Sequence, residues 1–321
     1  MLRHYGIHSR FLIALPVLVF GEKSARSMLE RILPRFLSMG LVTRDKEPAF
    51  RQVIVEMIRL RDSTLPWVAI GGAILMAALV PSTGHNLAEL AWARDQHGTL
   101  GFGGWWFLCV SRPLYQIFLF GWVWRGVLLF LLFRKIAKLR LELEPAHPDH
   151  LGGLAFVTQV PRLFAPMAFS MSVVMSSKWA HEIAWHGAHI SHFKMEAAAL
   201  GALLLLISHA PLLVFLSTLK KTKRRALAEY GTLIARHARL VRKVWIKGEP
   251  VEDRSLLEAP ELGPTCDINS IYESVTSMRR TPFGKSSALP VLMAAALPML
   301  IVSAMEIPVA ELAGKVFKAL L

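Results

Sequence analysis

Five long apolar runs constrain this chain more than any other feature of its sequence. They occupy residues 65–81, 105–133, 154–178, 195–219 and 286–305. At ~1.5 Å of rise per helical residue, each run covers most or all of the ~30 Å hydrocarbon layer of a bilayer. Hydrophobic residues make up 54% of the 321 residues, which is more than one soluble core of this size normally hides. The sequence therefore predicts an all-α, polytopic membrane helix bundle.

Lysine and arginine are distributed unevenly among the segments that separate these runs. Three segments are basic, with 11, 4 and 14 such residues: 1–64, 134–153 and 220–285. Three others hold only one or two: 82–104, 179–194 and the tail after 305. Because basic loops are retained in the cytoplasm, the first three segments are predicted to be cytoplasmic. The net charge of +14 is thereby explained by membrane topology, without nucleic acid as a partner.

This topology divides the chain into four parts. Residues 1–64 hold an apolar run at 11–20, predicted to be a short or half-inserted membrane helix, and a basic cytoplasmic segment. Residues 65–219 are predicted to form a four-span bundle. Residues 220–285 form a basic cytoplasmic helical segment, and residues 286–321 form the last span and a short tail.

The third basic segment contains two predicted helices. Residues 222–247 place apolar side chains at three- and four-residue spacing and basic side chains largely elsewhere, which is typical of an amphipathic helix. We interpret it foremost as lying against anionic headgroups and the bundle, and second as a docking face for a cytoplasmic protein. The basic residues of this face are Arg236, Arg239, Arg242 and Lys243. A shorter helix is predicted over 265–278, capped by Thr265 or Asp267.

Several motifs are similar to those of one protein family. They are FLIALPVLVFGE at 11–22, VSRPLYQ and WVWR within 105–125, HPDHLGGL at 147–154, AEYGTL at 228–233, CDINSI at 266–271 and MRRTPF at 278–283. Over nearly its whole length the chain resembles a family of uncharacterised bacterial multi-spanning inner-membrane proteins. That family has a His-Pro-Asp-x-x-Gly-Gly-Leu motif and a later Thr-Asp-x-Gln-Ser motif. The resemblance implies a multi-pass protein of the bacterial inner membrane and brings no established activity.

The chain departs from this family pattern at two points. Asn269 stands where the later motif has a longer amide, so contacts made through that amide are expected to change. Family members commonly carry a further apolar helix ahead of the segment that matches 11–22. This chain begins after that helix, which favours a membrane helix at 11–22 that is entered from outside.

The most polar and turn-prone peptide between apolar runs is EPAHPDHLGGLAF at 144–156. Its two prolines stop the preceding helix, and Asp149 is predicted to cap the next one. Gly152 and Gly153 are predicted to let the backbone pack closely against a neighbour. The residues of a candidate cytoplasmic mouth for ion capture or proton exchange are His147, Asp149, Asp267 and Asn269.

Polar groups inside the predicted spans are functional candidates because hydrocarbon makes them costly. The residues predicted to line a translocation path are Arg112, Gln116, Arg162 and His209. Both arginines and the histidine have a proline within two residues, which frees backbone carbonyls and kinks a helix. No acidic residue lies deep in the spans, so the arginines are predicted to meet an anion or a lipid phosphate. Snorkelling and structural hydrogen bonds are the alternative.

Catalytic and metal signatures are weak in this chain. Four histidines crowd the predicted outer loop, and His186 and His189 are weak candidates for a shared metal, because no cysteine or well-placed carboxylate completes the site. The sequence has no phosphate-binding Gly-rich loop and no GxSxG, HExxH or CxxC motif. We therefore expect no cofactor, and an enzyme is the less favoured class.

Two functional hypotheses follow from these residues. The leading one is translocation of a small ion or of an anionic or proton-coupled solute. The alternative is a non-transporting membrane scaffold or regulator that binds a partner or anionic lipid through its cytoplasmic helices. Small residues such as Gly71 and Gly72 permit close helix packing, either within one chain or in an oligomer.

Overall fold

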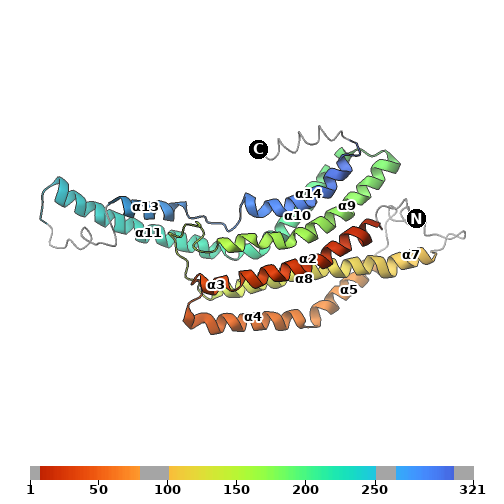
Figure 1. The fold of residues 1–321 in the computed structure, drawn as a ribbon, viewed down its shortest axis with the longest axis horizontal. Coiled ribbons are helices and arrows are strands. Elements are labelled where there is room, and N and C mark those ends of the chain that lie inside the picture. Colours follow the sequence, from red (N-terminus) through yellow and green to blue (C-terminus); the bar gives the residue numbers. More distant parts are fainter. Residues whose placement is uncertain (1–7, 80–100, 251–264, 307–321) are drawn as a thin grey trace.

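The computed structural model describes residues 8–79, 101–250 and 265–306 (Figure 1). In chain order the helices are η1 (Ser9–Ala14), α2 (Leu15–Ile32), α3 (Arg35–Ser38), η2 (Arg44–Lys46), α4 (Glu47–Asp62), α5 (Leu65–Leu79), α7 (Phe102–Trp106), η4 (Phe107–Ser111), α8 (Arg112–Lys138), η5 (Ala155–Phe164), α9 (Ala165–His186), η6 (Ile190–Phe193), α10 (Lys194–Leu213), α11 (Leu216–Val241), η7 (Arg242–Ile246), α13 (Thr265–Ser277) and α14 (Lys285–Ser303). These ranges contain no strand, so the all-α prediction is confirmed.

Three helices in the described part of the chain are long and apolar enough to cross a membrane. They are the continuous helix Gly104–Lys138, which includes α8, the helix Ile190–Leu213, which includes α10, and α14. They correspond to the second, fourth and fifth predicted spans. Long helices lie side by side along the longest axis of the molecule, as expected for helices that share a bilayer (Figure 1).

The other two predicted spans differ from the helices observed. For the first predicted span, the structure describes the helix α5, which has 15 residues. Leu79, its last residue, is also the last described residue of this segment. The third span, 154–178, is not one α-helix. Its first part is the tighter 3-10 helix η5, with Pro161 inside it, and α9 then continues through the predicted outer loop to His186. A proline that lacks an N–H donor is compatible with this change of helix type.

The N-terminal helix is longer than predicted. The expected short helix at 11–20 is part of a continuous helix formed by η1 and α2, which ends at Ile32. A buried stripe along it includes Ala14, Leu18 and Gly21. A Cβ atom on Gly21 would lie 2.5 Å from Cβ of Pro166. A glycine here therefore allows α2 to touch the start of α9.

α9 is the central helix of the bundle, because α14, α2 and η1 all pack against it. It buries the serines at positions 170, 172, 176 and 177. One of them, Ser172, donates a hydrogen bond to the backbone carbonyl of Ala295 in α14. Neighbouring helices rather than lipid cover much of α9, so small and polar residues are tolerated there. The same packing explains why α9 is less apolar than the three helices named above.

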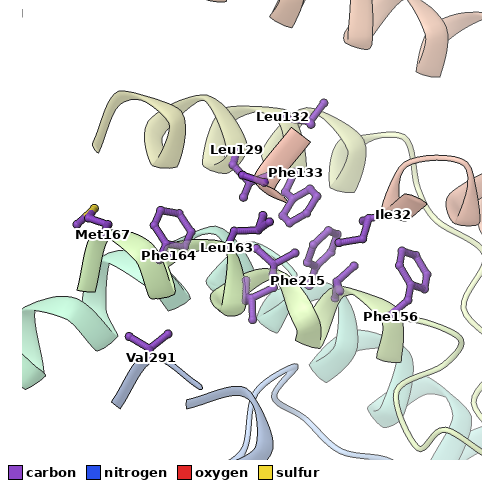
Figure 2. Close-up of a cluster of buried hydrophobic side chains, with 14 of the residues drawn as sticks. Ile32, Leu129, Leu132, Phe133, Phe156, Leu163, Phe164, Met167, Phe215 and Val291 are labelled. Carbon is purple, nitrogen blue, oxygen red and sulfur yellow. The ribbon is translucent and has the colours of Figure 1, made fainter. Parts of the chain in front are cut away.

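Aromatic rings are part of the buried hydrophobic cluster between the helices (Figure 2). The fully buried ring of Phe36 in α3 has its centre 5.0 Å from that of Phe156 and 6.2 Å from that of Phe133. The Phe133 ring lies 5.3 Å from Phe215, which stands between α10 and α11. These contacts bring α3, α8, η5 and the α10–α11 junction into one hydrophobic core.

α11 continues beyond this core, away from the other long helices, and α13 packs against it (Figure 1). We refer to α11, η7 and α13 as the basic arm. The helices predicted at 222–247 and 265–278 are thereby confirmed, although α11 begins earlier, at Leu216. The predicted position of the first helix against anionic headgroups stays a prediction. α11 prolongs α10 along the longest axis of the molecule (Figure 1).

Candidate functional site

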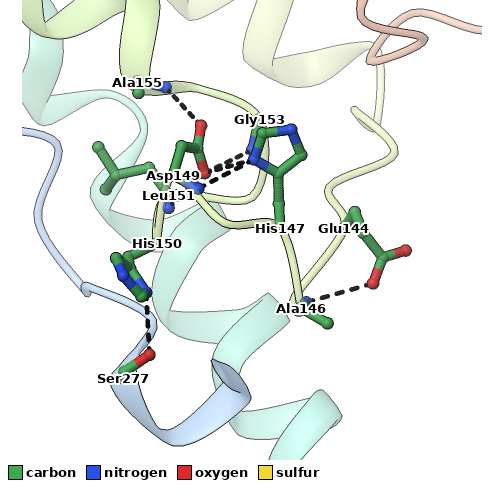
Figure 3. Close-up of polar contacts among 9 residues, drawn as sticks. All are labelled: Glu144, Ala146, His147, Asp149, His150, Leu151, Gly153, Ala155 and Ser277. Atoms are coloured by element: carbon green, nitrogen blue, oxygen red, sulfur yellow. Dashed lines mark hydrogen bonds and ion pairs between the residues drawn. The ribbon is translucent and has the colours of Figure 1, made fainter. Parts of the chain in front are cut away.

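The HPDHLGGL peptide forms a turn organised by the carboxylate of Asp149 (Figure 3). Oδ1 of Asp149 accepts hydrogen bonds from the backbone N–H of Leu151 at 2.8 Å and of Gly153 at 3.1 Å. Oδ2 accepts the N–H of Ala155, the first residue of η5, at 3.0 Å. Two donors of the turn and the first donor of η5 thus share one carboxylate. The predicted capping role of Asp149 is confirmed.

The three donors keep Asp149 ionised. Burial raises the pKa of this carboxyl, but the backbone N–H groups and the neighbouring His147 outweigh burial and hold the pKa below its ordinary value. Nδ1 of His147 lies 2.9 Å from Oδ1 of Asp149 and 3.2 Å from its backbone nitrogen. A protonated ring donates to the carboxylate, whereas a ring with a free Nδ1 lone pair accepts the backbone N–H. The imidazole is therefore a second support of the turn.

Two glycines allow the turn to pack closely against the chain around it. Gly152 and Gly153 have φ angles of +65° and +91°, a region that L side chains rarely adopt. A Cβ atom on Gly153 would lie 3.2 Å from Cδ2 of Leu41, and one on Gly152 would lie 3.1 Å from Cβ of Leu143. The predicted close packing at these glycines is confirmed, and left-handed backbone adds a second reason for glycine.

Hydrogen bonds join the turn to the end of α13. Nδ1 of His150 lies 2.9 Å from Oγ of Ser277, and the backbone N–H of Arg279 donates to the carbonyl of His150 at 2.7 Å (Figure 3). The Nζ of Lys223 in α11 donates to two carbonyls at this helix end, those of Thr276 and Met278, each at 2.6 Å. A cation at a helix C-terminus is also favoured by the helix dipole.

Long-range partners of this kind were not identified from the sequence. Residue types alone pointed to the carboxylate and imidazoles of the HPDH peptide, but they did not predict the contacts of His150 with Ser277 or of Lys223 with the end of α13. Ser277 is 127 residues from His150 in the chain, and Met278 is 55 residues from Lys223. The spacing of residues within one helix or turn does not predict contacts between residues so far apart in the chain. The turn and its partners therefore form a structural junction that only the fold reveals.

The structure places two of the predicted translocation-path residues, Arg112 and Arg162, apart from each other. Gly126 of α8 packs against Phe164, two residues after Arg162. Arg112 begins α8, fourteen positions before Gly126, which corresponds to ~21 Å along the helix. Arg162 is exposed in η5, and Gln116 is half-buried near Arg112. Arg112 and Arg162 therefore lie at different levels of the bundle.

His209 holds two helices together. Its Nδ1 lies 3.0 Å from the carbonyl oxygen of Leu205, one turn earlier in α10. Its Nε2 lies 3.2 Å from Oγ of Ser287 in α14, and its ring meets that of Phe283 edge to face at 5.9 Å. Both ring nitrogens have partners within the protein. His209 thus forms structural hydrogen bonds, which were the alternative prediction for the polar residues of the spans.

A polar cluster lies where the N-terminal helix meets the start of α8. The guanidinium of Arg10 lies 5.4 Å from the ring centre of Phe107, so the π-helical turns η1 and η4 are adjacent. The hydroxyl of Tyr115 lies close to Ser170 and Arg10. The buried hydroxyls of Ser111 and Ser176 have no hydrogen-bond partner in the described part of the chain.

The histidines of the predicted outer loop lie in two pairs, His181 with His186 and His189 with His192, and one histidine of each pair contacts a glutamate. His186 faces Glu182 at 3.3 Å, and Nδ1 of His189 lies 2.6 Å from Glu306. Glu306 also accepts the backbone N–H of Ile190 at 2.7 Å. These contacts hold the pKa of Glu306 below its ordinary value, with His189 as the main cause. The described residues contain no group of three or more potential metal ligands.

The predicted basic face lies on the basic arm. The side chains of Arg236, Arg239, Arg242 and Lys243 are all exposed. Asn269 is exposed on α13, whereas the side chain of Asp267 lies outside the described residues. Asp149 lies in the turn at the base of the arm. The structure therefore separates the predicted mouth residue Asp149 from the exposed cations of the arm.

Comparison with protein-family models, with curated proteins and with solved structures found no match for this chain. The family resemblance carried by HPDHLGGL and the other motifs stays a prediction. The geometry and charge of the chain's own residues therefore carry the functional inference.

Proposed function

We propose that this protein is a non-transporting, multi-pass scaffold of the bacterial inner membrane whose basic arm docks an acidic cytoplasmic protein. The observation that carries the proposal is a set of exposed cations on the arm that form no ion pair within the described part of the chain. Arg239, Arg242 and Lys243 are exposed, and none of them forms an ion pair with a described residue. Exposed charges of one sign without a partner among the described residues attract a partner of the opposite sign.

The excess of charge extends along the whole of the first arm helix. Residues 216–250 contain ten lysines and arginines and two glutamates. One glutamate, Glu229, pairs with Arg225 at 2.7 Å, and the other, Glu249, lies 3.6 Å from Lys247. The positive field that remains favours association with an acidic surface and accelerates the encounter.

The reach of the arm favours a protein over the bilayer as its partner. From Leu216 to Ile246 the helix rises by ~45 Å, which is far more than the Debye length of ~8 Å at physiological salt. At the tip, Trp245 is 80% exposed and Ile246 is 76% exposed. Exposed tryptophan among basic side chains is a composition typical of protein interaction hot spots.

Photo-crosslinking in intact cells tests this proposal. A photoreactive residue at position 246 is expected to give a discrete protein adduct, because Ile246 is exposed at the tip of the arm. The same residue at position 58 of α4, where Ile58 is 44% exposed, is the matched control and is expected to give none. Lipid adducts alone from position 246 would place the tip on the membrane and contradict a protein partner.

Charge reversal identifies which side chains carry the contact. The combined variant Arg239→Glu, Arg242→Glu and Lys243→Glu is expected to abolish the adduct at position 246. The variant Lys23→Glu, Arg26→Glu and Arg31→Glu on α2 changes the net charge equally and is expected to leave the adduct unchanged. Equal loss in both variants would show that net charge rather than the arm governs capture.

A second candidate function, translocation of a small ion, is supported by the buried hydroxyls near Arg10 and Tyr115. Unpaired hydroxyls inside a membrane bundle are costly, and water in a path would pair them. Flux into proteoliposomes with chloride, phosphate, potassium and proton probes tests this function. Loss of flux in Arg112→Ala, with flux retained when Arg236, Arg239 and Arg242 are all alanine, would support it. Absence of flux from correctly inserted protein would exclude simple ion conduction.

A further inference from the structure

A groove of about 550 Å³ lies between α8 and the junction of α10 with α11. Part of its lining is apolar and comes from Phe130, Ala137, Leu213 and Val214. The rest of the lining carries the cations of Arg134, Lys138 and Lys221 and the hydroxyls of Ser217 and Thr218. The groove is thus amphipathic: it offers apolar contact together with positive charge and hydrogen-bond donors.

Helical spacing places the charged residues on facing stripes. Arg134 and Lys138 are four residues apart on α8, and Phe130 precedes Arg134 by four, so all three share one face of that helix. Ser217 and Lys221 are likewise four residues apart on α11. The two stripes converge in the groove because α8 and α10 are packed neighbours.

The three cations of the groove have no counter-ion within the described part of the chain. The adjacent Lys135 provides the contrast, because its Nζ lies 2.5 Å from Oε2 of Glu56 in α4. Neither hydroxyl of the groove, of Ser217 or Thr218, forms a hydrogen bond with another described residue. Cations and donors gathered in one groove without internal partners are suited to a bound phosphate.

The groove lies where two apolar helices become basic. The apolar sequence of α8 ends at Phe133, directly before Arg134, and that of α10 is followed by Ser217 and Lys221 within two turns. Both helix ends belong to the side that the distribution of lysine and arginine assigns to the cytoplasm. Phospholipid phosphates lie at this boundary, with acyl chains on its apolar side.

We infer that this groove binds one anionic phospholipid of the cytoplasmic leaflet. Its phosphate lies among Arg134, Lys138 and Lys221, and the hydroxyls of Ser217 and Thr218 donate to phosphate oxygens. The acyl chains follow the apolar lining. A soluble phosphate would leave that lining in water, so the lipid is the better match. The inference is independent of the basic arm's partner, because other side chains carry it.

Native mass spectrometry of the purified full-length protein in detergent tests the assignment. Titration with phosphatidylglycerol is expected to give one tightly bound lipid, with weaker binding of zwitterionic phosphatidylcholine. The variant Arg134→Gln, Lys138→Gln and Lys221→Gln is expected to weaken phosphatidylglycerol binding by about tenfold or more, because each basic residue attracts anionic lipid. Its binding of phosphatidylcholine is expected to be unchanged.

The matched control is Lys23→Gln, Arg26→Gln and Arg31→Gln, which removes the same charge from exposed positions of α2. Undiminished affinity for phosphatidylglycerol is expected in this control. Equal affinity in the groove variant and the parent protein would overturn the assignment, as would equal losses in both variants. Displacement of the lipid by inorganic phosphate would make a soluble anion the ligand and would overturn it as well. The variant Ser217→Ala and Thr218→Val, which keeps every charge, is expected to weaken binding to a smaller extent.

Discussion

The turn at 147–154 and the basic arm lie next to each other but differ in their polar side chains. Those of the turn are hydrogen-bonded within the protein, whereas those of the arm are exposed. In the turn, Asp149 is mostly buried, with a side chain 15% exposed, and bonds three backbone donors. On the arm, Arg239, Arg242 and Lys243 are exposed and have no ion pair with a described residue.

This difference separates residues that hold the fold from residues that are available to other molecules. A buried group whose partners are supplied by the chain contributes to stability, and its removal leaves unpaired donors behind. An exposed cation without an internal partner contributes little to stability. Substitutions in the turn are therefore expected to lower stability, whereas substitutions on the arm are expected to change binding alone.

The largest expected effect is that of Asp149→Ala. Three buried N–H groups lose their acceptor, which is expected to lower the free energy of unfolding by about 3 kcal/mol. Thermal unfolding of the detergent-solubilised protein measures the change. Asp62→Ala is the matched control, since Asp62 is exposed and its one ion pair among the described residues is with the adjacent Arg61. A loss no greater than that of the control would contradict the capping role.

The next effect concerns the left-handed backbone of the turn. Gly153→Ala is expected to cost about 2 kcal/mol, because alanine is strained at a φ of +91° and its Cβ would press on Leu41. In Gly201→Ala the new Cβ meets nothing within 4 Å, and alanine is the better helix former. The control Gly201→Ala is expected to leave the free energy of unfolding unchanged or to raise it. A loss of stability equal to that of Gly153→Ala would contradict a special role for the left-handed backbone at Gly153.

A smaller effect is expected where the arm joins the turn. Lys223→Met removes two hydrogen bonds to the carbonyls at the end of α13 and is expected to cost about 1.5 kcal/mol. Hydrogen exchange should show faster exchange in α13, with α10 unaffected. Lys220→Met is the control on the same helix, because Lys220 is exposed. Unchanged protection of α13 in Lys223→Met would mean that this lysine does not hold the helix.

The smallest effect is a dependence on acidity. Because folding lowers the pKa of Asp149, its contribution to stability is fully present above the unfolded value of about 4 and is lost as the pH falls through the lowered folded value. The unfolding temperature of the parent protein is expected to fall more steeply below about pH 4 than that of Asp149→Asn. Glu306 has a lowered pKa as well, but it is present in both proteins and cancels in the comparison. Parallel pH profiles would contradict the ionised state of Asp149 in the turn.

Local features of the sequence predicted much of the fold. Continuous apolar runs identified the three helices long and apolar enough to span, and periodic apolar residues identified α11. The capping role of Asp149 and the close approach at Gly153 followed from residue types within a few positions. The end of α9 at His186 was not predicted, because its serines are covered by other helices and its apolar pattern is correspondingly weak.

The remainder of the candidate site depends on contacts between distant parts of the chain. His209 meets Ser287 across 78 residues, and this contact links α10 to α14. The groove cations on α8 and α11 become neighbours only when these helices pack together. No local pattern in a single sequence indicates which distant residues lie close together in space. These pairs could therefore be identified only from the structure.

The most direct test of the account compares stability and capture in one charge-reversed protein. The variant Arg239→Glu, Arg242→Glu and Lys243→Glu is expected to unfold within about 0.5 kcal/mol of the parent protein, because exposed side chains carry little stability. In the same preparation, its protein adduct from position 246 is expected to disappear. An intact adduct, or a stability loss as large as that of Asp149→Ala, would contradict the claim that the arm's cations serve a partner rather than the fold.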